Sequence, residues 1–289
     1  MIRRLILLAL TIAPVAQASV SVTDDAGHTV MLAAPAQRIV SLAPNITDAL
    51  FAAGAGSHVV GTSRFSEHPE GAKAIPVIGD ATTLDLERIV SLKPDLVVAW
   101  KSGTPAAQVE KLSRLGIPVF YAETTRLADI APAVRRFGVL AGTGAEADRQ
   151  AAAFDTALAK LRATYAGRKH LKVFFQVWDK PLMTIGHAQI IDDAIELCGG
   201  TNLFADLNQA APTVTREAVL ARAPDAIVTV GADEASLDMW KASAFLPAVK
   251  HGNVFVIDAP TLVLPSPSIL PAVETLCRRL DDARRRADH

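Results

Sequence analysis

The sequence lacks the features that most directly mark a nucleic-acid-binding or a membrane-spanning protein. Its 289 residues carry a formal net charge of −1, which gives no support for a polyanionic partner such as nucleic acid or an anionic membrane surface. No apolar run reaches the roughly 20 residues that are needed to cross a bilayer. We therefore expect a protein that binds no nucleic acid and does not insert into a membrane.

Motifs of common enzyme classes are also missing. There is no G-x-S-x-G, no Walker phosphate loop and no G-x-G-x-x-G after a strand-like run. The seven histidines are scattered, with no pair four residues apart on an expected helix, whereas metal sites need clustered ligands. We expect no metal site, no cofactor and no enzymatic activity, although catalytic residues need not be close in sequence.

The N-terminus predicts a secretory signal peptide over residues 1–18. Two arginines precede a short apolar run that starts at Leu5, and Ala16 and Ala18 give the A-x-A pattern of a cleavage site. The run is too short for a permanent anchor. Cleavage after Ala18 would leave the mature protein free in an exported compartment, most simply a periplasm.

Cysteine is scarce, and only Cys198 and Cys277 are present. In an oxidising compartment an isolated pair favours one disulfide, which the chain-entropy model values at roughly 4 kcal/mol for a long loop. Two buried free thiols are the alternative that the sequence leaves open.

Strand-like and helix-like segments alternate in two blocks along the mature chain. The stretch "VSVTDDAGHTVMLAAP" predicts a β-hairpin around a turn at Asp24–Gly27. Amphipathic segments then separate the apolar runs "RIVSLAP", "HVVGTS", "LVVAW" and "PVFYA", and the alternation restarts with "KVFFQVW", "AIVTVG" and "VFVID". This order is typical of parallel sheets covered by helices.

Between the two blocks lies a segment without strands. Its second part, "AEADRQAAAFDTALAKLRATYAG", predicts a helix of about 23 residues, which would be about 35 Å long. We predict an α/β fold with two similar lobes of mostly parallel sheets bridged by this one long helix. The predicted boundaries are 19–142 for the N-terminal lobe, 143–167 for the connecting helix and 168–289 for the C-terminal lobe.

One phrase occurs in both blocks. "ERIVSLKPD" begins at Glu87 and "EAVLARAPD" begins at Glu217, each before a strand-like run, and an Asp-Ala pair precedes each copy at 48–49 and 193–194. A glutamate in the first turn of a helix stabilises it by about 0.3–1 kcal/mol, and Thr215 is a suitable cap for the second helix. Alternatively, two similar lobes would expose both glutamates on one face, suited to arginine pockets on a two-fold symmetric partner.

Three stretches carry a resemblance: the run from "RIVSLAPNITDALFAAGAG" to "LVVAW", then "LGIPVF", then "ELCGGTNLFADLNQAAPTVTREAVLARAPDAIVTVG". They resemble the periplasmic cobalamin-binding receptors of ABC importers, in a family that also captures ferric siderophores and haem. The resemblance covers nearly the whole mature chain. It implies two α/β lobes joined by a backbone helix, a ligand between them, little hinge closure and a receptor that is monomeric when free.

The resemblance also assigns roles to individual residues. Glu87 and Glu217 match the glutamates that bind arginines on the permease dimer, which works with its ATPase subunits. Cys198 and Cys277 match a disulfide of cobalamin binders. These roles are what the resemblance implies for this chain.

Three aromatic residues are candidates for the ligand site. Phe65 and Trp100 match a cleft tyrosine and a cleft tryptophan of the cobalamin receptors, and both follow strands, where open α/β sheets bind ligands. Trp178 has the corresponding place in the other block. The alternative for each is a packed core or rim position. Arg64, and Arg126 less directly, could face an anionic group on a ligand.

Other positions depart from the cobalamin-binding pattern. Ala81 and Ala211 stand where the receptors have tryptophans, and Leu264 stands in place of an arginine. Haem would require a protein ligand, for which Tyr121 and His68 are the candidates. We expect cobalamin or a related corrinoid, with haem or a ferric siderophore as the alternative and an exported α/β enzyme as a remote one.

Overall fold

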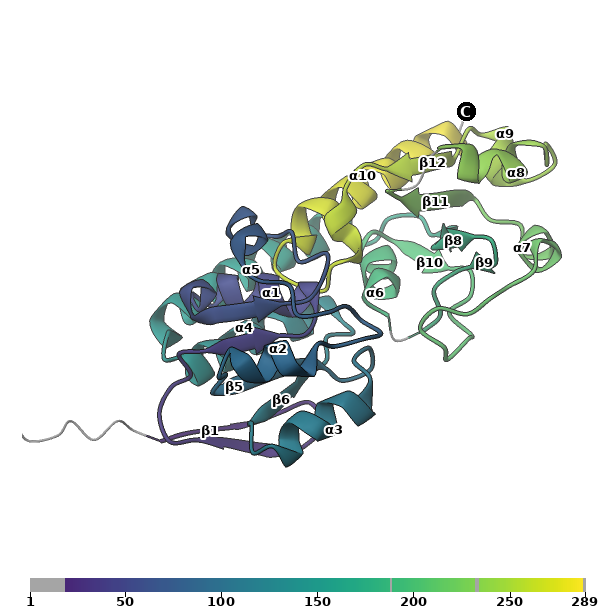
Figure 1. Cartoon of the computed structure of the whole chain (residues 1–289). Coiled ribbons are helices and arrows are strands. Elements are labelled where there is room, and N and C mark those ends of the chain that lie inside the picture. Colours follow the sequence, from purple (N-terminus) through teal and green to yellow (C-terminus); the bar gives the residue numbers. More distant parts are fainter. Residues whose placement is uncertain (1–18, 188, 232–233, 288–289) are drawn as a thin grey trace, which may run out of the picture.

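A computed structural model describes residues 19–187, 189–231 and 234–287. The predicted signal peptide, residues 1–18, lies outside the described residues. The described chain folds as two α/β lobes (Figure 1), so the predicted fold class is confirmed. Among the described residues, no helix is both long and apolar enough to span a bilayer.

The N-terminal lobe is built on a four-stranded parallel sheet. Its strands are β3 (Ile39–Ser41), β4 (Val59–Thr62), β5 (Leu96–Trp100) and β6 (Val119–Ala122), in the spatial order β4-β3-β5-β6. A hairpin precedes them, formed by β1 (Val20–Thr23) and β2 (Thr29–Leu32). The helical elements are α1 (Pro44–Ala52), η1 (Gly56–His58), η2 (Glu70–Ala74), α2 (Leu86–Ser91), α3 (Ala106–Arg114), η3 (Leu127–Asp129) and α4 (Ile130–Ala141).

The C-terminal lobe repeats this plan with a second four-stranded parallel sheet. Its strands are β7 (Leu171–Gln176), β10 (Gly200–Asn202), β11 (Ala226–Val230) and β12 (Val254–Ile257), in the order β10-β7-β11-β12. A short hairpin follows β7, formed by β8 (Trp178–Asp179) and β9 (Leu182–Met183). The helical elements are α6 (Ile190–Leu197), α7 (Arg216–Arg222), η4 (Glu234–Leu237), α8 (Asp238–Lys241), α9 (Pro247–Lys250), η5 (Pro260–Val263) and α10 (Ile269–Ala287).

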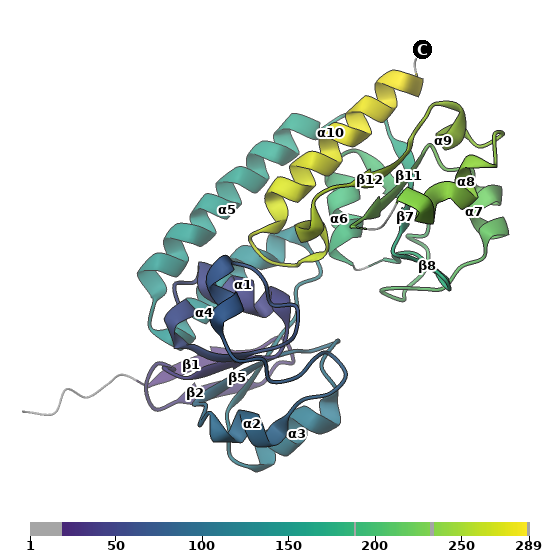
Figure 2. The same cartoon turned by 45° about the horizontal axis from the view of Figure 1, so that its top comes forward.

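One long helix bridges the lobes, as predicted, and a second helix packs along it. The predicted connecting helix is α5 (Gly144–Tyr165), and α10 runs beside it (Figure 2). A disulfide between Cys198 and Cys277 joins the C-terminal end of α6 to α10. The place of α10 beside α5 depends on contacts between residues that are distant in the chain, so residue spacing does not predict it.

Both faces of each sheet are buried, which explains the nearly continuous apolar runs of the strands. In β5, Val98 points into the largest apolar cluster, which includes residues of α1, α4, α5, α6 and α10. Its neighbour Val97 points into a separate cluster with residues of α2 and α3. In β11, Val228 and Ile227 alternate in the same way between the largest cluster and one that contains Trp240. The largest core therefore continues from one lobe into the other.

Two continuous runs of the sequence are divided into separate elements in the structure. The run "KVFFQVW" is not one strand, because β7 ends at Gln176 and Trp178 begins the hairpin. The run "MWKASAFLPAVK" is not one helix: α8 ends at Lys241, and α9 starts afresh at Pro247, where a proline favours the first helical position.

Candidate functional site

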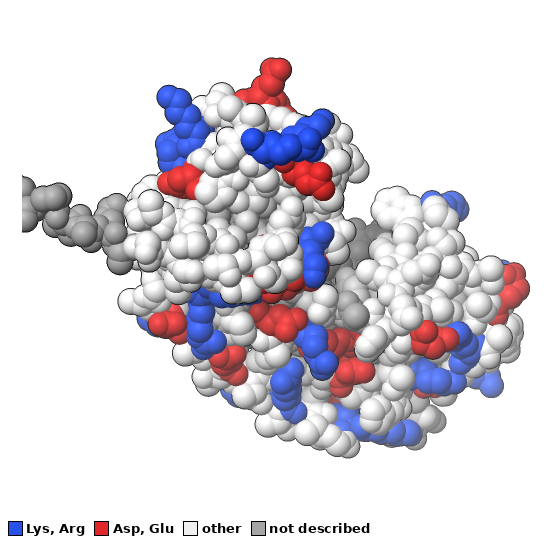
Figure 3. All heavy atoms as spheres, turned by 90° about the horizontal axis from the view of Figure 1, so that it is seen from below, with Lys and Arg blue, Asp and Glu red and all other residues white. Residues whose placement is uncertain are grey.

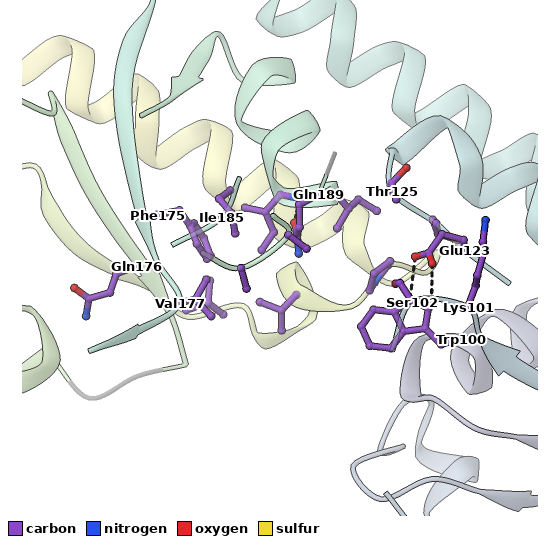
Figure 4. Close-up of a pocket in the computed structure, with 18 residues that line it drawn as sticks. Trp100, Lys101, Ser102, Glu123, Thr125, Phe175, Gln176, Val177, Ile185 and Gln189 are labelled. Carbon is purple, nitrogen blue, oxygen red and sulfur yellow. Dashed lines mark hydrogen bonds between the residues drawn. The ribbon is translucent and has the colours of Figure 1, made fainter. Parts of the chain in front are cut away.

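A cavity of about 560 Å³ lies between the two lobes. It sits at the carboxyl ends of β5, β6, β7 and β11, where open α/β sheets place ligands. Figure 4 shows Phe175, Val177 and Ile185 on one side and Trp100 and Glu123 on the other. Its lining, mostly apolar, consists of Trp100, Lys101, Ser102, Glu123, Thr124, Thr125, Phe175, Gln176, Val177, Ile185, Gln189, Ile190, Ile191, Ala210, Ala211, Val230, Val263 and Pro265.

The indole of Trp100 is fixed in this cavity from two sides. Its Nε1 donates a hydrogen bond to Oε1 of Glu123 at 2.9 Å, and the backbone N of Ser102 donates to Oε2 at 2.9 Å (Figure 4). On the other edge, a Cβ added at Gly103 would lie 1.9 Å from the Trp100 ring. The ring therefore needs both the acceptor and the glycine to keep its place.

The sequence prediction missed Glu123. Its backbone N donates to Oδ2 of Asp25 at 2.8 Å, and Asp25 forms a bidentate ion pair with Arg136 at 2.8 and 2.9 Å. The predicted N-terminal hairpin thus holds the strand end that carries Glu123. The available signal was an acidic residue directly after "PVFYA", at the carboxyl end of a strand.

The three departures from the cobalamin-binding pattern lie in different places. Ala211 lines the interlobe cavity, whereas Ala81 lines a smaller cavity of about 290 Å³ on the N-terminal lobe. Val263 and Pro265 line the interlobe cavity, but Leu264 between them does not. Because alanine is small, Ala81 and Ala211 leave space in two separate cavities.

The smaller cavity brings together Arg64, Phe65, Ala81 and Trp100. Phe65 has φ 67° and is 74% exposed, although a left-handed backbone is unusual for a bulky residue. Trp100 lines both cavities, so the two adjoin at this residue. The structure therefore groups three of the predicted ligand residues around the smaller cavity.

Buried hydroxyl groups hold the turn that carries Phe65. Oγ1 of Thr47 lies 2.7 Å from that of Thr62 and 3.3 Å from Oγ of Ser66, and Ser66 lies 3.2 Å from Ser63. All four side chains are buried. A hydrogen-bonded network of this kind can hold a strained turn in one conformation.

Trp178 does not line either cavity. Its indole donates to the carbonyl oxygen of Lys180 at 3.0 Å, and the residue is 60% exposed. The end of β7 at Gln176 and the hairpin after it turn Trp178 away, and Val177 lines the cavity instead. The geometry does not support the predicted contact of Trp178 with a ligand.

The residues considered for other ligands also lie elsewhere. Tyr121 packs against the apolar cluster of α2 and α3, where burial, with Glu110 and Asp24 nearby, raises the pKa of its phenol. His68 is exposed and lines neither cavity, and Arg126 donates to Asp193 at 3.2 Å. Within the described part of the chain, the lining of the interlobe cavity includes no His, Tyr, Cys or Met, and no group of three or more His, Cys, Asp or Glu side chains could hold a metal ion.

Glu87 and Glu217 occupy equivalent positions, each the second residue of a short helix. Asp85 caps α2 and Thr215, as predicted, caps α7 through a side-chain oxygen that accepts from the backbone. Both glutamates are exposed, and neither forms an ion pair with another described residue. Their carboxylates are therefore available to a partner.

The end of the repeated phrase also has the same structure in both lobes. The Asp95 carboxylate accepts from the backbone N of Arg38, and that of Asp225 accepts from the backbone N of Lys172, at 2.9 and 2.8 Å. Each bond ties the phrase to the start of the first strand of its sheet. The exposed glutamates are thus held on equivalent, rigidly attached supports.

Two bridged α/β lobes around an apolar cavity define a receptor for a small molecule. The chain belongs to the periplasmic binding protein family, whose sequence model matches residues 39–261. The expectation that the chain is not an enzyme is confirmed by its relatives, which are binding proteins.

The relatives are similar over most of their length. A vitamin B12-binding protein of Vibrio cholerae is 34% identical over 252 residues, which cover 87% of this chain and 91% of that protein. The crystal structure of BtuF, the periplasmic vitamin B12 binding protein of Vibrio cholerae, matches with a TM-score of 0.82 and 34% identity, covering 86% of this chain and 98% of that one. The periplasmic heme-binding protein RhuT from Roseiflexus sp. RS-1 has a TM-score of 0.74 and 25% identity, with 86% and 98% covered.

Proposed function

We propose that this chain is a periplasmic receptor that captures cobalamin or a related corrinoid between its lobes and delivers it to an ABC permease. The observation that carries the proposal is the apolar interlobe cavity with Trp100 fixed as one wall. A large, mostly flat ligand needs apolar and aromatic walls with a few polar anchors. The similarity to vitamin B12-binding proteins supports the same ligand class.

The chemistry of the lining favours a corrinoid over haem. A corrinoid carries its own cobalt, and the receptor needs only to contact the ring. Haem in a protein is held by an axial side chain such as His, Tyr, Cys or Met, and the described lining of the cavity contains none of these. Among the described residues that line the interlobe cavity, the charged ones are Lys101 and Glu123, so no cluster of positive charge faces an anionic ferric siderophore there.

Delivery would depend on the two exposed glutamates. Glu87 and Glu217 lie on separate lobes at equivalent helix starts, so a two-fold symmetric permease dimer could bind both through arginines. On the face drawn in Figure 3, acidic and basic side chains are interspersed rather than gathered by sign.

In the proposed function, the chain is first exported to the periplasm. Residues 1–18 would direct the chain to the periplasm and be removed there, and the free receptor would be a monomer. No covalent step is needed, because capture and docking complete the transport task.

The test is titration of the mature protein with cyanocobalamin, haemin and a panel of ferric siderophores by calorimetry and absorbance. We expect tight binding of cyanocobalamin and no binding of haemin. Tight binding of haemin without a response to cyanocobalamin would reject the proposal. Trp100→Ala should lower the affinity about tenfold or more, whereas Trp178→Ala should leave it unchanged because that indole lines neither cavity.

A further inference from the structure

The smaller cavity on the N-terminal lobe has the walls of a binding subsite. Its lining includes Arg64 and Phe65 from one turn, Ala81 from a second loop, and Trp100 from the end of β5. Its apolar floor is formed by the residues at the end of β3 and the start of α1: Leu42, Ala43 and Pro44. At about 290 Å³ it is too small for a whole tetrapyrrole, so it would take only part of a ligand.

Trp100 connects this subsite to the interlobe cavity. The N–H edge of its indole is bonded to Glu123, which lines the interlobe cavity, and the opposite edge lies on Gly103, which lines the smaller one. A ligand that stacks against Trp100 in the main cavity could therefore extend an arm past the indole into the smaller cavity.

Arg64 contributes a cation to the lining of the smaller cavity. The guanidinium of Arg64 is exposed and has no hydrogen bond or ion pair with any described side chain. The nearby carboxylate of Asp80 accepts through Oδ1 from Thr82 Oγ1 at 2.7 Å, Thr82 N at 2.9 Å and Thr83 N at 3.0 Å, and these bonds, together with the charge of Arg64, hold its pKa below the usual range. Arginine presents a planar set of donors that matches a phosphate or carboxylate.

The position of Arg64 is set by its backbone. Its N donates to the carbonyl oxygen of Gly79 at 2.8 Å, which joins the two loops that form the walls. Buried Ser63 and Ser66 flank the pair Arg64-Phe65, and their hydroxyls lie 3.2 Å apart. A subsite with fixed walls loses less conformational entropy when a ligand binds.

We propose that this cavity binds the nucleotide arm of a corrinoid, with Arg64 on its phosphate and its flat base against Phe65 and Trp100. The inference rests on the proposed function and makes its ligand more specific. Ala81 is essential to it, because a large side chain at that position would fill the space that the base needs.

The test compares cyanocobalamin, which has the nucleotide arm, with dicyanocobinamide, which lacks it, by calorimetry on the full mature protein. The wild type should bind cyanocobalamin about tenfold more tightly or better, since a charge-assisted bond to phosphate is lost with the arm. Arg64→Ala and Ala81→Trp should each weaken binding of cyanocobalamin and leave dicyanocobinamide unchanged. Arg64→Lys should retain part of the preference.

Two control variants separate the subsite from the main cavity. Ala211→Trp alters the interlobe cavity and should change both affinities in the same direction, whereas Lys180→Ala removes an exposed cation on the β8–β9 hairpin and should change neither. Thermal unfolding of every variant checks that it is folded.

The outcomes distinguish this inference from the proposed function. Equal wild-type affinities for the two corrinoids, or losses in Arg64→Ala that are shared by both, would overturn the subsite and leave the corrinoid receptor intact. Failure of the wild type to bind either corrinoid would overturn the proposed function and the subsite with it.

Discussion

The carboxylate of Asp193, in the first turn of α6, accepts a hydrogen bond from the backbone N of Leu127 in the other lobe at 2.8 Å. The relationship is reciprocal, because Asp48 on α1 accepts from Oγ of Ser268 at 3.0 Å, in the segment that leads to α10. Both aspartates are at least nine-tenths buried. Each lobe therefore uses the aspartate of its first helix to hold a segment of the other lobe.

Asp193→Ala should lower the free energy of unfolding by about 1–3 kcal/mol, because it leaves the buried N–H of Leu127 without an acceptor. Urea unfolding followed by circular dichroism measures the change. Asp193→Asn keeps an acceptor and should cost less. Asp238→Ala, which removes an exposed ion pair with Lys241, should cost below about 1 kcal/mol. A wild-type midpoint for Asp193→Ala would contradict the role of this contact.

Glu123→Ala should weaken cyanocobalamin binding by about tenfold, since the Trp100 indole loses its acceptor and its fixed orientation. Calorimetry gives the affinity, and tryptophan fluorescence of the unliganded protein reports the change around the indole. Glu123→Gln keeps one acceptor oxygen and should lose less. Glu110→Ala is the matched control on α3, and its affinity should equal that of the wild type.

Gly103→Ala should also reduce the affinity, for a steric reason. The added Cβ would lie 1.9 Å from the Trp100 ring, so the ring must move out of its place between the two cavities. Gly144→Ala places a methyl group where nothing lies within 4 Å, and it should leave binding unchanged. Retention of full affinity by Gly103→Ala would show that the ligand does not depend on the orientation of Trp100.

Removal of the disulfide should lower the free energy of unfolding by about 4 kcal/mol without loss of the fold. The fold should persist because the guanidinium of Arg284 on α10 also donates to the carbonyl oxygens of Cys198 and Gly199, at 2.7 and 2.9 Å. Urea unfolding with and without a reductant measures the loss, and the double variant Cys198→Ser/Cys277→Ser should reproduce it. Identical midpoints under both conditions would refute the prediction.

The double variant Glu87→Ala/Glu217→Ala should bind cyanocobalamin normally and fail to support its uptake in cells. The reason is that both carboxylates are exposed on helix starts and neither lines a cavity. The control Glu110→Ala/Glu274→Ala removes two other exposed carboxylates, and its uptake should stay normal. Undiminished uptake in the first variant would exclude the docking role.

Much of the architecture was accessible from local patterns. The hairpin around Asp24–Gly27 follows from a turn signal between alternating segments, and the start of α7 follows from Thr215 as its cap. The repeated phrase predicted two similar lobes, because a helix, a turn and a buried strand are each encoded by neighbouring residues. These features need no knowledge of distant contacts.

The contacts that form the candidate site join residues that are far apart in the sequence, so the spacing of residues along the chain did not predict them. Glu123 was missed because its role arises from the indole of Trp100, 23 residues earlier, across two adjacent strand ends. The aspartates at 48 and 193 were noticed only as part of the repeat, since their partners come from the opposite lobe. Trp178 lies away from both cavities because a two-residue strand pair reverses the chain just after β7.

The reciprocal aspartates also have a mechanical consequence. They join the two lobes to each other, whereas Glu87 and Glu217 are carried on supports that Asp95 and Asp225 fasten to the two sheets. Because each glutamate is tied to the sheet of its own lobe, a rotation of one lobe against the other would change the distance between Glu87 and Glu217. A permease that bound both glutamates would therefore respond to the relative position of the two lobes without contacting the interlobe cavity.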